Sequence, residues 1–179
     1  MQPIPPRVCD VPPHLSLPID VRWGHRRDIP AMARIEKDVF EFAWTEDELK
    51  YFMFETKAEP GLVQTAWYND HLIGYMLYDR VPGCIELTVL AVARHYWRMG
   101  VGSQLLHSIP KLDNPRQIIV TEVREHNVIA QLFFQSLGFQ LTAVHHEAYS
   151  RTDDDCYEFT RGIDGTSPAW PANRISQFS

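Results

Sequence analysis

This chain of 179 residues is 45% hydrophobic, which suffices for one domain with a buried core. Its net charge of −6 argues against general nucleic-acid binding, because binding phosphates requires a basic face. No apolar run approaches the roughly 20 residues of a membrane span, and the N-terminus does not have the pattern of a secretory signal. The three cysteines, an odd number without metal-ligand spacing, predict a reduced protein with no disulfide framework and no metal. Together with the lack of a membrane span, they predict a cytoplasmic protein with no membrane contact.

The two ends of the chain differ in composition from its middle. Residues 1–18 are rich in proline, which sustains neither a helix nor a central strand, and residues 162–179 again contain prolines. Both ends are predicted to be tails. They flank a single predicted domain at residues 19–161, in which we find no internal repeat and no interdomain linker.

The first third of the predicted domain contains one strand and two helices. Alternation at Ile19–Arg22 predicts the strand. Apolar residues at helical spacing over residues 28–39, with a proline in the first turn, predict the first helix. Thr45 and Glu48 have the spacing of a capping box, which predicts a second helix that continues to about Glu55.

Strand patterns dominate the middle of the chain. Residues 62–68 and 71–78 flank Asn69-Asp70, and two strands around a two-residue polar turn predict a hairpin. The elements expected after it are a strand at 85–92, a third helix that Pro110 ends, a strand at 117–123, a helix at 128–137, and strands at 139–148 and 155–160. This order predicts a protein of the α/β class. Its sheet is expected to be mixed, of the α+β type, with helices on both faces.

The most informative segment is the junction between the strand at 85–92 and the third helix. It reads Arg98-Met99-Gly100-Val101-Gly102-Ser103, with two glycines where the helix begins. A helix N-terminus leaves N–H groups unpaired and carries partial positive charge, and glycine lets an anion approach closely, so the segment predicts a cradle for a pyrophosphate. Leu105 replaces the third glycine of dinucleotide folds, and Gly102-Ser103-Gln104 lacks the lysine of nucleoside triphosphate loops.

Three separate segments carry the pattern of one enzyme family. Leu90-Ala91-Val92, a short loop and Arg98–Ser103 form the first, and Glu122-Val123-Arg124 with a helix and Leu137-Gly138-Phe139 forms the second. Both resemble the GCN5-related N-acetyltransferase (GNAT) family, the first in its acetyl-CoA motif. Two features are similar to the ribosomal-protein-alanine N-acetyltransferase subgroup: the Glu-Val-Arg sequence, and the third segment, which consists of Ile35-Glu36 and Phe40–Glu46.

The resemblance implies both a fold and an activity. The expected fold is GNAT-like, with a central, mostly antiparallel sheet that contains a splayed strand pair. The expected reaction moves an acetyl group from acetyl-CoA, as cosubstrate, to a primary amine by direct attack in a ternary complex. The subgroup indicates the α-amine of a protein N-terminus as acceptor. A small-molecule amine acceptor and a catalytically weak CoA-binding regulatory protein are the alternatives, and the resemblance leaves monomer and homodimer open.

In the family, the splayed strands receive the pantetheine arm and the glycine loop holds the pyrophosphate. Two positions depart from the family pattern, because Trp97 stands where Arg or Gln is usual and Phe134 stands where the subgroup has a proton-donating tyrosine. Asn127, at a helix start, is expected to cap that helix and also to reach the cofactor. The residues assigned to acetyl-CoA are Leu90, Ala91, Val92, Trp97, Arg98, Met99, Gly100, Val101, Gly102, Ser103, Asn127 and Phe134.

Glu122 matches the position of the family's catalytic glutamate and is the candidate general base. An α-amine, with a reference pKa of about 7.7 to 8.0, must be neutral when it attacks, so a nearby carboxylate that takes its proton assists the reaction. A glutamate of raised pKa, produced by partial burial, would serve better. The structural alternative is a strand-end glutamate that is exposed or paired with Arg124.

The departing thiolate requires a proton, and a phenyl ring at Phe134 cannot supply one. Tyr149 is the first candidate for this acid, and His145 or His146 is the second. Phe42 and Trp44, in the irregular linker between the first two helices, are the candidates for the acceptor channel. Surface exposure of the histidines and packing of the aromatic rings are the structural alternatives.

Overall fold

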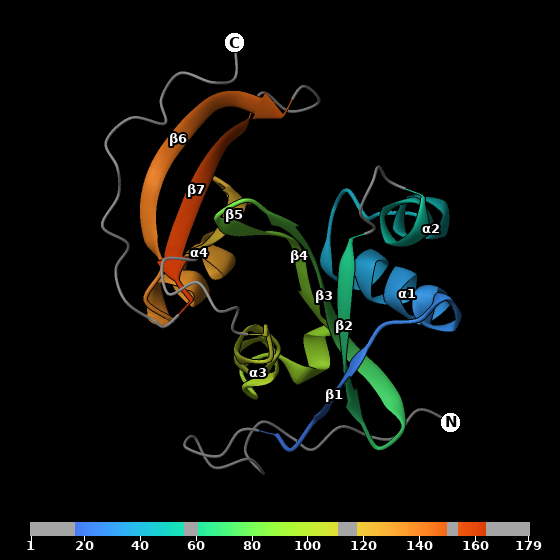
Figure 1. Ribbon diagram of the computed structural model, residues 1–179. Helices are drawn as coiled ribbons and strands as arrows, with labels where there is room; N and C mark the ends of the chain where they lie inside the picture. The colour runs from blue at the N-terminus through green and yellow to red at the C-terminus, as the bar shows by residue number, and fades with distance from the viewer. Residues whose placement is uncertain (1–16, 56–60, 111–117, 150–153, 164–179) are drawn as a thin grey trace. The chain divides into compact units, whose positions relative to one another are not determined.

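The computed structural model describes residues 17–55, 61–110, 118–149 and 154–163 (Figure 1). These residues belong to two compact units. The first unit lies within Met1–Val81 and Glu86–Pro110, and the second lies within Pro82–Ile85 and Lys111–Ser179. Most of both predicted tails falls outside the described residues. Leu17, which the sequence assigned to the N-terminal tail, is nevertheless buried, with 3% of its surface exposed.

The first unit contains strands in the order β1-β2-β3-β4. The strands are β1 (Asp20–Trp23), β2 (Leu62–Tyr68), β3 (His71–Val81) and β4 (Cys84–Val92), of which residues 84–85 belong to the second unit. β2 pairs antiparallel with both β1 and β3. Asn69 and Asp70 join β2 to β3 with φ angles of 47° and 61°, the left-handed pair that a type I′ turn requires. The predicted hairpin is therefore confirmed.

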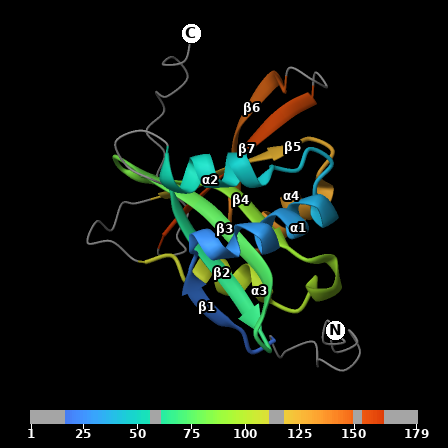
Figure 2. The same ribbon diagram turned by 90° about the vertical axis from the view of Figure 1, so that its right-hand side faces the viewer.

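Two helices cover one face of this sheet and a third lies on its other face (Figures 1 and 2). They are α1 (Ile29–Val39), α2 (Glu46–Phe54) and α3 (Val101–His107). The predicted capping box opens α2, because the Thr45 N–H donates to Glu48 Oε2 at 2.7 Å and the Glu48 N–H donates to Thr45 Oγ1 at 3.2 Å. The core under α1 and α2 includes Met32, Ile35, Leu49, Phe52, Tyr75 and Leu77.

A carboxyl group lies inside this core. Glu36 on α1 is 1% exposed, and it accepts one hydrogen bond from the Tyr75 hydroxyl and one from the Trp44 N–H at 2.8 Å. Burial raises the pKa of Glu36, although both hydrogen bonds act to lower it. Burial, with the nearby Glu36 carboxyl, also raises the pKa of Tyr75. The pair links α1 to β3 and to the connection that leads into α2.

The second unit contains β5 (Ile118–Arg124), α4 (Val128–Ser136), β6 (Gln140–Tyr149) and β7 (Asp154–Gly162). β7 pairs antiparallel with both β5 and β6, so the last strand lies between the two earlier ones. The start of β4 also belongs to this unit, where the Ile118 N–H donates to the Gly83 carbonyl at 3.5 Å. Since most of β4 belongs to the first unit, the splayed strand pair stays a prediction.

The C-terminal end of α4 is closed by backbone and side-chain donors. Gly138 has a φ of 84°, and the N–H groups of Gly138 and Phe139 return to carbonyls of the last turn, as in a Schellman motif. Arg161 on β7 is buried, and its Nη1 donates to the Leu137 carbonyl at 2.9 Å. Its guanidinium lies 5.1 Å from the centre of the Phe139 ring. Burial lowers the pKa of Arg161.

The mixed α/β class that the sequence predicts is confirmed. Seven strands and four α-helices are present in the described ranges, and most of their bounds lie within two residues of the predicted ones. None of the helices in these ranges is long and apolar enough to cross a membrane.

The buried carboxyl makes stability depend on pH in a specific direction. A pKa raised in the folded state means that the stabilisation is complete below the unfolded pKa and is lost as pH rises through the folded pKa. We therefore expect the wild type to lose stability relative to Glu36→Gln as the pH rises above 4.5, the ordinary pKa of a glutamate side chain. Urea unfolding of both proteins at about pH 5 and pH 7.5 measures this difference. Glu41→Gln, at an exposed glutamate, is the control, and identical pH dependence in wild type and Glu36→Gln would contradict a raised pKa.

Candidate functional site

We call Trp97–Ser103, which leads into and begins α3, the phosphate loop. Arg98 and Gly100 in this loop have left-handed φ angles of 65° and 76°. Left-handed residues next to right-handed ones form concavities in which successive N–H groups bind anions. Glycine adopts this conformation freely, whereas for Arg98 it costs about 1–2 kcal/mol. Contacts elsewhere in the unit must therefore hold the loop in its observed form.

In the phosphate loop, the Trp97 N–H donates to the Arg94 carbonyl at 3.2 Å, and the N–H groups that follow it are open. Within the part of the chain that the structure describes, residues 97–100 form a turn, and no N–H from Arg98 to Ser103 makes a well-aligned hydrogen bond to a backbone carbonyl. The first bond of α3 begins one residue later, where the Gln104 N–H donates to the Gly100 carbonyl at 3.0 Å. The open groups of α3 follow from helix geometry, since the first N–H groups of any helix have no intrahelical partner. A run of N–H groups without a backbone acceptor therefore leads into α3, and its use for a pyrophosphate stays a prediction.

Trp97 turns its side chain toward the protein's own backbone. Its indole Nε1 donates to the Val92 carbonyl at 2.5 Å, and the Arg94 guanidinium lies 5.1 Å from the centre of its ring. The Val92 carbonyl is thus already bonded, although the sequence assigns it to the pantetheine arm. The side chain of Ala91 is fully buried, so only its backbone could meet a ligand. Trp97 consequently fastens the loop to the end of β4.

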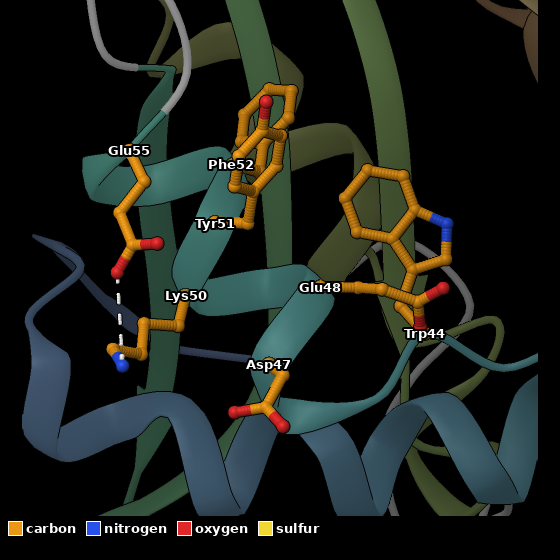
Figure 3. A pocket seen from close by; sticks show the side chains of 7 residues that line it. All are labelled: Trp44, Asp47, Glu48, Lys50, Tyr51, Phe52 and Glu55. Carbon is orange, nitrogen blue, oxygen red and sulfur yellow. Dashed lines mark ion pairs between the residues drawn. The ribbon is translucent and has the colours of Figure 1, made fainter.

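Phe42 and Trp44 lie in the connection between α1 and α2, as the sequence predicts. Phe42 is exposed, whereas the Trp44 ring packs on Phe52 with their centres 5.7 Å apart. Beside this connection, a pocket of about 690 Å³ is lined by Trp44, Asp47, Glu48, Lys50, Tyr51, Phe52 and Glu55 (Figure 3). Its lining combines aromatic rings with carboxylates, a combination that attracts cationic groups. Lys50 lies 3.7 Å from Glu55 and neutralises part of this charge.

The second unit presents two carboxylates on one face of its strands. Glu122 on β5 is exposed and lies directly across from Glu158 on β7, and paired residues of antiparallel strands project to the same face. Glu158 accepts a hydrogen bond from Thr142 Oγ1 at 2.8 Å and lies 3.7 Å from His145 Nε2. Arg124, the alternative partner of Glu122, pairs with Asp154 at 2.8 Å. Glu122 is therefore the more accessible of the two facing carboxylates.

The candidates for the acid differ in their surroundings. His145 lies beside Glu158, on the face that carries Glu122. His146 instead lies with its Nδ1 2.9 Å from Asp155 Oδ2, and both histidines are exposed. The Tyr149 backbone belongs to β6, but its side chain lies outside what the structure describes. Of the two histidines, His145 is the one that shares the carboxylate face.

Two further residues assigned to acetyl-CoA have structural roles in the second unit. Asn127 caps α4, because its Oδ1 accepts a hydrogen bond from the Ala130 N–H at 3.1 Å. Phe134 is buried, and its ring meets the rings of Phe133 and Phe139 edge to face, with centres 5.2 and 5.1 Å away. Contact of Asn127 and Phe134 with acetyl-CoA stays a prediction.

The sequence assigned no functional role to some residues near these groups. Glu36 interrupts the apolar stripe of α1, and a carboxyl at such a position is the signal that could have found it. In the described ranges, Glu125, His126 and Asp154 place their ligand atoms within 4.8 Å of one another, the spacing of a metal site. Arg124 already pairs with Asp154, and His126 lies 3.3 Å from Glu125, so ion pairing accounts for this group.

Comparison with known proteins was made for sequence and for structure. The [Ribosomal protein bS18]-alanine N-acetyltransferase of Escherichia coli K12 is 29% identical over 130 residues, which cover 70% of this chain and 84% of that protein. The crystal structure of the ribosomal-protein-S18-alanine N-acetyltransferase from E. coli matches with a TM-score of 0.68 and 21% identity, over 87% of this chain and 97% of that one.

A plant enzyme has a similar fold. Arabidopsis thaliana NAA60, solved in complex with a bisubstrate analogue, matches with a TM-score of 0.68 and 18% identity, over 83% of this chain and all of that one (100%). A family model described as the acetyltransferase (GNAT) family matches residues 29–139. Because this match covers more than half of the sequence, the chain belongs to the acetyltransferase (GNAT) family.

Proposed function

We propose that this acetyl-CoA-dependent N-acetyltransferase acts on the α-amine of a protein N-terminus, with a ribosomal protein as the target type. The run of open N–H groups from Arg98 to Ser103, at the acetyl-CoA motif of the family, carries the cosubstrate part of this proposal. The acceptor part is supported by the E. coli relative, whose name specifies the alanine of ribosomal protein bS18. Cys84 and Cys156 are buried as thiols, which suits a reducing compartment, and we propose the cytoplasm.

The phosphate loop fits the charged part of acetyl-CoA. Its open N–H groups would hold the pyrophosphate, and no acidic side chain occurs between Trp97 and Ser103 to repel it. When bound, acetyl-CoA supplies the thioester whose acetyl group is transferred. The backbone of Leu90 and Ala91, on the strand that precedes the loop, would hold the pantetheine arm.

Glu122 would prepare the acceptor amine. At neutral pH most α-amines are protonated, because their reference pKa is about 7.7 to 8.0. An exposed carboxylate can take that proton directly or through a water molecule. Glu158, across from Glu122, adds a second negative charge that attracts a cationic amine. Glu122 is therefore proposed as the general base, and Glu158 as a charge that recruits the acceptor.

The thiolate that leaves must also be protonated. Phe134 cannot donate, so Tyr149 is proposed as the acid, and His145 beside Glu158 is the second candidate. A Tyr149→Phe variant is expected to lower kcat by about tenfold to a hundredfold while CoA affinity stays the same. Steady-state kinetics with saturating acceptor measures this effect. His146→Gln, at a histidine bound to Asp155, is the control, and an unchanged kcat in Tyr149→Phe would transfer the role to His145.

Removing the proposed base should impair turnover rather than cofactor binding. Glu122→Gln keeps the side-chain volume but cannot accept the proton, and kcat/KM should fall by about a hundredfold or more. Release of free CoA in the presence of an N-terminal peptide measures the rate. Glu158→Gln is the matched control across the strand pair, with its smaller effect falling on the KM of the acceptor. Full activity of Glu122→Gln would remove Glu122 from the mechanism.

The acceptor class can be tested directly. Peptides with free N-termini, including one that begins with alanine, should release CoA faster than polyamines, aminoglycosides or free amino acids at equal concentration. Blocking the peptide α-amine with a formyl group should abolish the reaction, because the attacking nitrogen is then no longer an amine. Faster turnover of a small amine would identify a small-molecule acetyltransferase instead. Tight CoA binding without turnover of any amine would identify a regulatory protein.

A further inference from the structure

Leu17 and Gln104 are joined through backbone and side-chain hydrogen bonds at the base of the phosphate loop. The Leu17 N–H donates to the Met99 carbonyl at 2.9 Å, and Gln104 Nε2 donates to the Leu17 carbonyl at 2.8 Å. Gln104 Nε2 also lies 3.4 Å from the Gly100 carbonyl, to which the Gln104 N–H donates at 3.0 Å. We call this set of contacts the Leu17–Gln104 brace.

The brace occupies carbonyl groups and leaves the neighbouring N–H groups open. In a planar trans peptide, the carbonyl of one residue and the N–H of the next point in opposite directions. Fixing the Met99 carbonyl toward Leu17 therefore aims the Gly100 N–H away from Leu17. Fixing the Gly100 carbonyl toward Gln104 likewise sets the direction of the Val101 N–H. Both of these N–H groups belong to the open run of donors.

We propose that the Leu17–Gln104 brace positions the phosphate loop for acetyl-CoA, with Gln104 as a positioning residue and Leu17 as its partner from the N-terminal segment. The proposal rests on the proposed use of these N–H groups for the pyrophosphate. It assigns a role to a glutamine that lies beyond the glycine motif and to a residue in a segment of tail-like composition. The Gln104 side-chain amide and the Leu17 backbone make these contacts, and they act through the direction of two peptide groups.

A second glutamine contact on α3 provides a matched comparison. Just beyond the other end of the helix, Gln64 Nε2 donates to the Ser108 carbonyl at 3.2 Å, and Ser108 Oγ donates to Gln64 Oε1 at 3.0 Å. Both glutamines thus donate from a side-chain amide to a backbone carbonyl and both help to hold α3. Only the Gln104 contact reaches the carbonyls of the phosphate loop.

The test uses full-length protein and CoA, without any acceptor. Gln104→Leu keeps the size of the side chain but removes its donor, and we expect CoA to bind about fivefold more weakly by calorimetry, the effect of one net hydrogen bond. Gln64→Leu should change the affinity for CoA by less than about twofold. Both variants should lower Tm by similar amounts, because each loses one side-chain donor at α3. If the two variants lose equal stability but only Gln104→Leu loses affinity for CoA, then Gln104 positions the loop and does more than stabilise the fold.

Leu17→Pro provides a second, independent variant, because proline has no N–H for the Met99 carbonyl. It should weaken CoA binding as Gln104→Leu does. In the double variant, the loss of affinity should be smaller than the sum of the two single losses, because both variants break the same set of contacts. If Gln104→Leu does not fold, Leu17→Pro with Gln64→Leu as control carries the test. Wild-type affinity in Gln104→Leu, or an equal loss in Gln64→Leu, would overturn the brace. A wild type that does not bind CoA would instead overturn the proposed function.

Discussion

Open backbone donors in the phosphate loop are the constraint on which the arrangement of the first unit depends. An N–H group without a partner in a desolvated site costs about 1–3 kcal/mol, so these donors must face water or an anion. The surrounding contacts meet this condition by engaging carbonyls, as Leu17 does at Met99 and as Trp97 does at Val92. The left-handed Arg98 is held in place by the same surroundings. An anion would therefore meet donors that are already arranged, which lowers the entropic cost of binding.

The second unit contributes a different kind of chemistry. Glu122 and Glu158 face each other across β5 and β7, and like charges at directly opposite positions repel. A cationic group near this face would relieve the repulsion, which suits an acceptor that arrives as an ammonium ion. Thr142 and His145 contact Glu158, whereas Glu122 is exposed, as a proton acceptor needs to be. In the proposed function, the first unit binds the phosphate and the carboxylates of the second unit act on the amine.

Features encoded within a few neighbouring residues could be predicted from the sequence. The Asn69-Asp70 turn, the Thr45 capping box and the glycine motif at residues 98–103 are of this kind, because their signals are short-range. Long-range pairing escaped prediction, since nothing local places β7 between β5 and β6. Leu17 lies in a segment of tail-like composition, and its place in the fold depends on long-range contacts such as those with Met99 and Gln104. The orientation of the Trp97 indole likewise depends on the position of a carbonyl in the folded chain.

Arg161 shows how a buried cation limits which residues a position accepts. No carboxylate in the described parts of the chain lies within ion-pair distance, so its charge is balanced by the carbonyl end of α4 and the face of Phe139. Lysine in the same place would shed its proton readily, because its pKa falls far more easily on burial than that of a delocalised guanidinium. The substitution Arg161→Lys looks conservative, but it would leave the end of α4 facing a neutral amine. Lysine is therefore a poor replacement for arginine at this position.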